Sequence, residues 1–215
     1  MVGNDVIDLL DGDADLTSYS ERFLERAFTR RERCRIEAAR DPALCTWRHW
    51  AAKEAAWKAM SKTRPSLIFS PSLLEVEAHP TDLDAARVRS LKDPALACEI
   101  RFLKAGSSIH ALAQEDAEGG ARVVHACERF DPEGPDTRDP GAPSRIARRL
   151  VCRSVAAALG IDAAQLEVRR QGRVPVLFRG SEPLLGNLSI AHHGRFAGFA
   201  FETLLACRTS FREAG

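Results

Sequence analysis

The sequence predicts an α+β protein of two similar subdomains, each with one long helix packed on a small, mainly antiparallel sheet. The first observation is length, because 215 residues suffice for two subdomains of roughly 100 residues each. The second is that helical and strand-like periodicities recur in the same order in both halves. The third is a glycine-containing loop at 116–120, where the first series of elements ends.

In the first half, a strand is followed by helices and then by further strands. Apolar residues at three- and four-residue spacing predict the helices, and runs of apolar and β-branched residues predict the strands. The predicted elements are a strand at Val2–Leu10, helices at Phe23–Ala39 and Ala43–Met60, and strands at Ser72–Ala78, Ala97–Leu103 and Ser108–Gln114.

The second half repeats this order of elements, although its letters do not repeat. The predicted elements are a strand at Ala121–Glu128, a helix at Ser144–Leu159 that ends at Gly160, and strands at Leu166–Arg170, Leu185–His192 and Phe196–Glu202. A Pro- and Gly-rich loop at 131–143 precedes the helix. We therefore expect subdomains 1–118 and 119–215, related by a pseudo-two-fold axis, with a site at their interface because clefts form where domains meet.

Charge and composition narrow the classes of partner. The chain has 31 Lys and Arg against 30 Asp and Glu, a formal net charge of +1, so nucleic acid or an anionic membrane would need a local basic patch such as 144–153. The sequence has no run of about 18 apolar residues and no basic leader, so we expect no membrane span and a cytoplasmic location. The six cysteines (34, 45, 98, 127, 152 and 207) form no CxxC pair and are predicted to be buried free thiols.

The segment WAAKEAAWK, from Trp50 to Lys58, is the most informative. On a helix, Trp50, Glu54 and Lys58 lie on one side, and Lys53 and Trp57 form the neighbouring stripe. This pattern fits an ordinary amphipathic helix with an ion pair between Glu54 and Lys58. It also fits a functional carboxylate held between two tryptophans.

Two acidic residues, Asp5 and Asp8, lie within the apolar N-terminal strand. Alternation places their side chains on opposite faces unless the strand ends or bends between them. Aspartate is depleted in strands, so its presence here points either to a surface turn or to a bound hard cation.

The third segment is a hairpin in the second half, with a corner at His193-Gly194. His192 lies beside this corner, where a side chain reaches either solvent or a ligand. Upstream, the glycine turn at 171–175 carries Arg173, and arginine is well suited to binding phosphate.

Together these segments resemble the 4′-phosphopantetheinyl transferases. Gly3-Asn4-Asp5 is similar to the family's G-[IV]-D stretch, and Trp50–Lys58 matches its [FW]-x-x-K-E-[AS]-x-x-K pattern. The stretch 22–29 resembles the R-F-x-x-R-x-F-[TS] of carrier-protein synthases. The stretch 172–194 is similar to the G-K-P…N-[LI]-S-H-S-G of surfactin-type enzymes, although there it precedes the G-x-D stretch. The order of the halves is thus circularly permuted, Asn4 replaces an aliphatic residue, and Ile7 replaces a second acid.

The resemblance implies a magnesium-dependent transferase. It would move the 4′-phosphopantetheine arm of coenzyme A to a serine of an acyl or peptidyl carrier protein and release adenosine 3′,5′-bisphosphate. Asp5 and Glu54 would hold Mg²⁺, with Asp8 as a further ligand in place of the missing acid. Glu54 would also take the serine proton, and Lys58 would stabilise or protonate the leaving oxygen.

The resemblance further implies that Arg173, His192 and Lys53 bind phosphates of coenzyme A. The acidic carrier protein would dock near 144–153 or near the Arg-rich segment 26–35, in fatty acid, polyketide or nonribosomal peptide synthesis. An internal pseudo-dimer favours a monomer. The alternative is a non-catalytic module that binds coenzyme A or nucleic acid, although the charge balance and the missing base-stacking pattern argue against nucleic acid.

Overall fold

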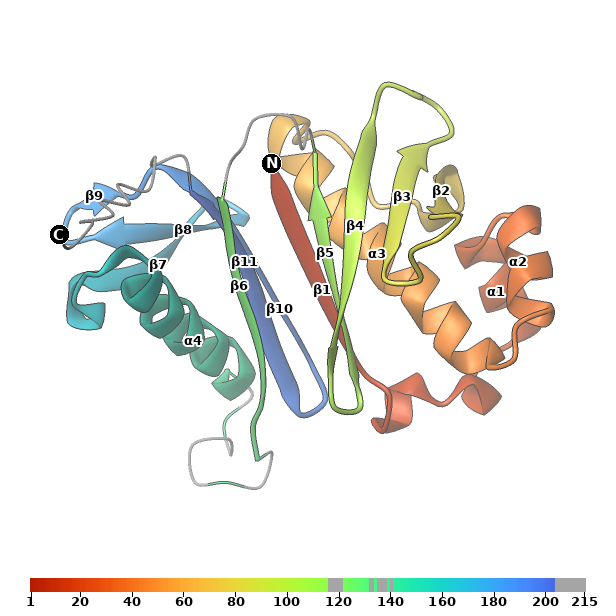
Figure 1. Cartoon of the computed structure of the whole chain (residues 1–215), viewed down its shortest axis with the longest axis horizontal. Helices are drawn as coiled ribbons and strands as arrows, with labels where there is room; N and C mark the ends of the chain where they lie inside the picture. The colour runs from red at the N-terminus through yellow and green to blue at the C-terminus, as the bar shows by residue number, and fades with distance from the viewer. Residues whose placement is uncertain (116–121, 132–133, 135–138, 140, 204–215) are drawn as a thin grey trace, which may run out of the picture.

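The computed structural model describes residues 1–115, 122–131, 134, 139 and 141–203 (Figure 1). The first group of elements is built around one long helix, α3, and a five-stranded antiparallel sheet of order β1-β5-β4-β3-β2. Its elements are β1 (Val2–Asp8), the short turns η1 (Gly12–Ala14) and η2 (Leu16–Ser18), α1 (Glu21–Ala27), α2 (Arg30–Glu37), α3 (Pro42–Thr63), η3 (Pro71–Leu73), β2 (Leu74–Ala78), β3 (Ala85–Ser90), β4 (Ala97–Ala105) and β5 (Ser108–Gln114).

The second group contains the helix α4 and two three-stranded antiparallel sheets, of order β10-β11-β6 and β7-β8-β9. Its elements are β6 (Arg122–Arg129), α4 (Ala142–Leu159), η5 (Ala163–Gln165), β7 (Leu166–Gln171), β8 (Val174–Arg179), β9 (Glu182–Pro183), β10 (Gly186–His193) and β11 (Phe196–Thr203). Gly160 caps α4 in the left-handed conformation, with φ of 67°, which glycine adopts without steric cost.

The two groups share part of their topology, and their helices packed on antiparallel sheets confirm the predicted α+β class. In each group the first strand pairs antiparallel with the last, β1 with β5 and β6 with β11. In each, the last two strands form a hairpin, β4–β5 and β10–β11, and one long helix packs on the sheet. The expected boundary near residue 118 falls within 116–121, outside the described residues.

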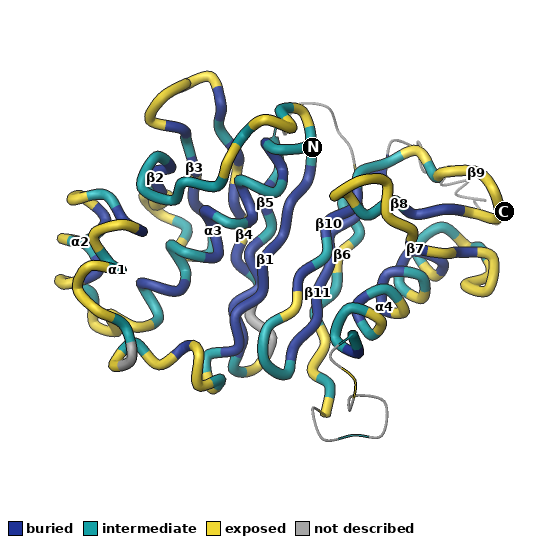
Figure 2. The backbone as a smooth tube through the Cα atoms, turned by 180° about the vertical axis from the view of Figure 1, so that it is seen from behind, coloured by how far each residue is buried: buried dark blue, intermediate teal, exposed yellow. Residues whose placement is uncertain are grey.

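Each group has a hydrophobic core of its own between helix and sheet. The first is unusually rich in alanine, since α3 contributes Ala51, Ala52, Ala55, Ala56 and Ala59. The second joins α4 to β7, β8, β10 and β11. Figure 2 shows buried backbone concentrated in β1 and β11, where the two groups meet. Small side chains on α3 let β1 lie close to the helix, and this closeness shapes the site described below.

Several predicted elements differ from the observed ones. The helix predicted at 23–39 is two helices, because Thr29 caps α2 through a reciprocal capping box with Glu32. Strands β3, β8 and β9 were not predicted. Pro175 lies in β8 opposite Arg170 of β7 and outside the pairing with β9, where its missing N–H costs no ladder bond.

The described cysteines are free, but the prediction that they are buried holds fully for Cys98 alone. Cys34 is exposed, and Cys45, Cys127 and Cys152 are half-buried, while Cys207 lies outside the described residues. The loop predicted at 131–143 lies largely outside them as well. None of the helices in the described part of the chain is long and apolar enough to span a membrane.

Candidate active site

Strand β1 crosses α3 in direct contact because position 3 has no side chain. A Cβ at Gly3 would lie 2.0 Å from the carbonyl oxygen of Ala55 and 2.7 Å from the amide nitrogen of Ala59. Both are backbone atoms of α3, so the strand would have to move away to accept any other residue. Asp5 follows on the same face of β1, two residues along, and is therefore held against the next turn of α3.

Asp5, Glu54 and Lys58 form a compact cluster between β1 and α3. The Lys58 ammonium lies 2.9 Å from Asp5 Oδ1 and 3.0 Å from Glu54 Oε1. The Asp5 side chain is 7% exposed, whereas Glu54 and Lys58 are 27% and 22% exposed. The cluster is thus buried at Asp5 and opens to solvent at the helix.

The electrostatics of the cluster are set by burial and by these two ion pairs. Burial raises the pKa of Asp5 to about 7; the Lys58 ammonium partly offsets this and the Glu54 charge adds to it. Burial opposes the charge of Lys58, but Asp5 and Glu54 together raise its pKa. Among the described residues, Asp5 Oδ2 has no hydrogen-bond partner although it is buried. Such an atom accommodates a further cation or donor.

A cavity of about 660 Å³ adjoins the cluster, between α3 and the second group of elements. Lys58 and Lys62 of α3 line one side, and Arg173 of the β7–β8 turn lines the other together with β10. Its described lining includes two lysines and one arginine but no carboxylate. Trp57 and Leu67 complete a partly apolar wall, fixed by a hydrogen bond from Trp57 Nε1 to the Leu67 carbonyl at 3.0 Å. This volume and lining suit an anionic organic ligand.

His192 lies on β10 beside the β10–β11 corner and is exposed. Partial desolvation of its ring lowers the pKa of His192, and the charges of Lys58 and His193 lower it further. The charge of Lys58, on α3, therefore acts across the junction on the imidazole from the second group. The structure thus places Asp5, Glu54, Lys58, Arg173 and His192 in or beside this region.

The sequence model of the 4′-phosphopantetheinyl transferase superfamily matches residues 1–126, which is more than half of the chain and includes β1, α3 and the whole Asp5–Glu54–Lys58 cluster. The chain belongs to this superfamily.

Relatives within the superfamily match a shorter segment. Over 59 residues the chain is 39% identical to the holo-[acyl-carrier-protein] synthase of Parvibaculum lavamentivorans, covering 27% of this chain and 44% of that protein. It is also 39% identical over 59 residues to that of Protochlamydia amoebophila, covering 27% and 48%. The chain therefore spans less than half the length of these relatives. The crystal structure of Thermotoga maritima holo-[acyl-carrier-protein] synthase (AcpS) overlaps with 85% of this chain and 83% of that one, at 14% identity and a TM-score of 0.39.

Lys53, the first lysine of the superfamily's K-E-A motif, does not face the cavity, which corrects the expectation that it binds phosphate. It is fully buried, and its ammonium donates to Glu32 Oε2 at 2.6 Å and to the carbonyls of Ala27 and Pro71, each at 2.9 Å. Glu32 in turn accepts from the Val76 amide at 2.8 Å. Lys53 therefore ties α1, α2, η3 and β2 to α3, and its three N–H donors serve the interior.

The expectation that Asp8 is a further metal ligand is also corrected. Both oxygens of its carboxylate already accept hydrogen bonds, mainly from Arg195, so they cannot bind a metal in this conformation. Oδ1 accepts from Arg195 Nη2 at 2.8 Å and from the Leu10 amide at 3.1 Å. Oδ2 accepts from Arg195 Nε at 2.8 Å and from the Arg195 amide at 3.1 Å. Hydrogen bonds from the Arg195 side chain lower the pKa of Asp8 to about 2. The residue anchors the β10–β11 corner to the end of β1.

Asp11, Asp13 and His193 also come close enough for their ligand atoms to share a cation. His193 Nδ1, however, accepts a hydrogen bond from the Asp8 amide at 3.1 Å, which places the ring proton on Nε2. A metal-bound histidine normally donates from its other nitrogen. With Nδ1 accepting and Nε2 protonated, neither ring nitrogen of His193 is free to bind a cation beside Asp11 and Asp13.

Sequence reasoning missed two residues that complete the site, Lys62 and Arg195. Lys62 continues the helical stripe that contains Glu54 and Lys58, four residues further on, so its spacing could have revealed it. Arg195 follows the corner glycine, and nothing in its surroundings points to a partner almost two hundred residues away.

Proposed function

We propose that the protein transfers the 4′-phosphopantetheine arm of coenzyme A to a serine hydroxyl of an acyl or peptidyl carrier protein. The serine oxygen forms a bond to the phosphorus that carries the arm, and the bond from that phosphorus to the bridging oxygen breaks, which releases adenosine 3′,5′-bisphosphate. The observation that carries this proposal is the cluster of Asp5, Glu54 and Lys58 at the edge of a cationic cavity, in a member of this superfamily.

Asp5 and Glu54 would hold Mg²⁺. They converge on one point that is already occupied by a cation, the Lys58 ammonium, and Asp5 Oδ2 is buried with no partner in the described chain. Two carboxylates suffice, because Mg²⁺ retains several waters in proteins. When bound, the ion would neutralise the pyrophosphate and the charge that develops on the leaving phosphate.

The chain's own side chains supply the proton transfers. Glu54 is half-buried at the mouth of the cluster, where its carboxylate can accept the proton of the attacking serine. Lys58 is charged at neutral pH because the two carboxylates raise its pKa, so it donates a hydrogen bond to the leaving oxygen. Asp5 is held in place by the close contact at Gly3, and from the buried side it orients Lys58 and, through Lys58, Glu54.

Coenzyme A would occupy the cavity of about 660 Å³. Arg173 enters from the β7–β8 turn, and its planar guanidinium suits bidentate binding of phosphate. His192 lies within electrostatic range of Lys58 and would bind a second phosphate on the same side. The site then requires both halves of the chain, which we propose act as subdomains 1–118 and 119–215 within a monomer.

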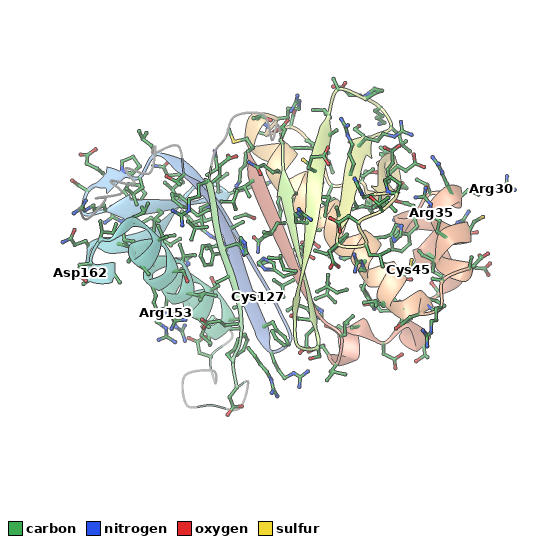
Figure 3. The ribbon with its side chains drawn as sticks, in the orientation of Figure 1. Arg30, Arg35, Cys45, Cys127, Arg153 and Asp162 are labelled. Atoms are coloured by element: carbon green, nitrogen blue, oxygen red, sulfur yellow. The ribbon has the colours of Figure 1, made fainter. Side chains whose placement is uncertain are left out.

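The carrier protein would dock against the Arg-rich segment 26–35 rather than against 144–153. Arg26 lines a groove of about 520 Å³ together with Phe23, Trp50 and Phe69, and Trp50 lies one helical turn before Glu54. Figure 3 shows Arg30 and Arg35 at the α2 end of the molecule and Arg153 on α4, at the other side. An acidic carrier bound at α1 and α2 would bring its serine toward Glu54. We place this reaction in the cytoplasm, in fatty acid, polyketide or nonribosomal peptide synthesis.

The test is incubation with coenzyme A, Mg²⁺ and a panel of apo carrier proteins, followed by intact mass measurement. We expect one carrier to gain the mass of one phosphopantetheine arm. Glu54→Gln should slow this gain by at least about 10²–10³-fold while the protein stays folded. The matched control is Glu182→Gln, an exposed change in β9 far from the cluster, which should act like wild type. Near-normal transfer by folded Glu54→Gln refutes the assignment, and coenzyme A binding with no transfer to any carrier indicates a non-catalytic module.

A further inference from the structure

The seam between the two groups of elements is closed by side chains instead of a β-ladder. Strands β1 and β10 pack against each other but belong to different sheets. The backbone N–H of Asn4 in β1 donates to Ser189 Oγ of β10 at 3.0 Å, in place of a strand partner. Unpaired strand edges carry free amides and carbonyls that require partners, and here single side chains provide them.

Lys62 is the side chain that satisfies backbone carbonyls at the same seam. Its ammonium donates to the Val2 carbonyl of β1 at 2.6 Å and to the Leu188 carbonyl of β10 at 2.7 Å. The same side chain lines the cavity beside Lys58 and Arg173. Lys62 therefore touches both halves of the chain and the proposed coenzyme A site at once.

We propose that Lys62 is a ligand-sensing clasp, which binds a phosphate of the cavity's ligand while it ties β1 to β10, so that occupancy of the cavity and closure of the seam are coupled. The identity of the ligand as coenzyme A rests on the proposed function. The number of donors supports the coupling. A neutral amine has two N–H groups, and the Val2 and Leu188 carbonyls use both. A ligand oxygen can accept from Lys62 only when the third proton is present.

The charges around Lys62 favour the gain of this third proton when an anionic ligand binds. Lys58 lies one turn away on α3 and Arg173 faces it from the β7–β8 turn, while Glu202 of β11, paired with the Met1 amino group at 3.3 Å, is the acidic neighbour. Burial lowers the pKa of Lys62 to about 7, and the Glu202 charge offsets this in part. Burial therefore favours the neutral form of Lys62 in the free protein, and a bound phosphate favours its charged form.

The test is calorimetric titration of the whole chain with coenzyme A at pH 8, with EDTA to exclude metal, in two buffers of different ionisation enthalpy. We expect wild type to take up close to one proton on binding. Lys62→Arg, which is always charged, should bind within about threefold of wild type but take up no proton. Lys62→Met should bind about tenfold more weakly or worse, also without uptake. The exposed Lys92→Met is the matched control and should behave as wild type.

Proton uptake by Lys62→Arg equal to that of wild type overturns the inference, as does wild-type affinity in Lys62→Met. The arginine variant decides alone if the methionine variant fails to fold, and it also separates Lys62 from His192, which remains in both. If wild type fails to bind coenzyme A, the proposed function is wrong, and the titration is repeated with inorganic pyrophosphate. The same pattern of affinity and uptake with pyrophosphate supports the clasp, and its absence overturns it.

Discussion

Asp8→Asn should cost about 2 kcal/mol of folding stability at pH 7, because the Arg195 guanidinium lowers the pKa of Asp8 from 3.8 to about 2. The carboxylate is fully buried and accepts four hydrogen bonds from the Arg195 side chain, the Arg195 amide and the Leu10 amide. Neutral asparagine keeps the shape but loses the ion pair, so the β10–β11 corner loses its anchor to β1.

The sign of the pH dependence follows from the lowered pKa. A depressed carboxyl pKa stabilises the folded state above the unfolded value of 3.8, and this contribution is lost as pH falls through 2. The difference in unfolding free energy between wild type and Asp8→Asn should therefore shrink from about 2 kcal/mol at pH 7 to about 1 kcal/mol at pH 3. For a chain of this length, the difference at pH 7 lowers Tm by about 4–8 °C.

Urea unfolding followed by circular dichroism, at pH 7 and pH 3, measures both values. Asp162→Asn is the matched control, since Asp162 is an exposed carboxylate in the second half (Figure 3) and asparagine can cap η5 as aspartate does. A difference that stays constant between the two pH values would show that the effect of Asp8→Asn is not electrostatic. A loss below about 0.5 kcal/mol at pH 7 would show that the ion pair contributes no more than a surface pair.

Three further outcomes test the packing and the site. Gly3→Ala should destabilise the protein by about 1–3 kcal/mol or more, measured by urea unfolding, because its Cβ would lie 2.0 Å from the Ala55 carbonyl. Lys53→Met should cost about 3–5 kcal/mol by leaving Glu32 buried and unpaired, and adding Glu32→Gln should recover part of that loss in a double-mutant cycle. His192→Ala should reduce the rise in Tm caused by coenzyme A and leave the Tm of the free protein nearly unchanged; an equal rise would exclude a phosphate contact.

The long periodic elements could be predicted because their patterns are local. The stripe of Trp50, Glu54 and Lys58 places the carboxylate and the ammonium on one side of a helix, and the structure agrees. The break before α2 also has a local signature, because Thr29 and Glu32 form an S/T-x-x-E capping box, although the apolar period across 23–39 continues through it.

The roles of Lys53 and Asp8 could not be predicted because their partners are distant in sequence. The family resemblance implies phosphate binding for Lys53, which precedes Glu54 in the motif, but one position along a helix turns a side chain by about 100°. That turn carries Lys53 into the interior, toward Glu32. Alternation correctly separated Asp8 from Asp5, but the decisive partner, Arg195, lies in the other half of the chain.

The superfamily match ends at residue 126, so the contribution of the second half rests on geometry. The matched half supplies all three members of the cluster, which are the carboxylates of Asp5 and Glu54 and the ammonium of Lys58. The wall of the cavity opposite α3 is built from β8, β10 and the turn that carries Arg173. A chain that supplied the matched half alone would leave the Asp5–Glu54–Lys58 cluster without this opposite wall, and water would screen its charges. The second half would enclose the proposed anionic ligand beside the cluster, and in an enclosed site each cation acts more strongly on a developing charge.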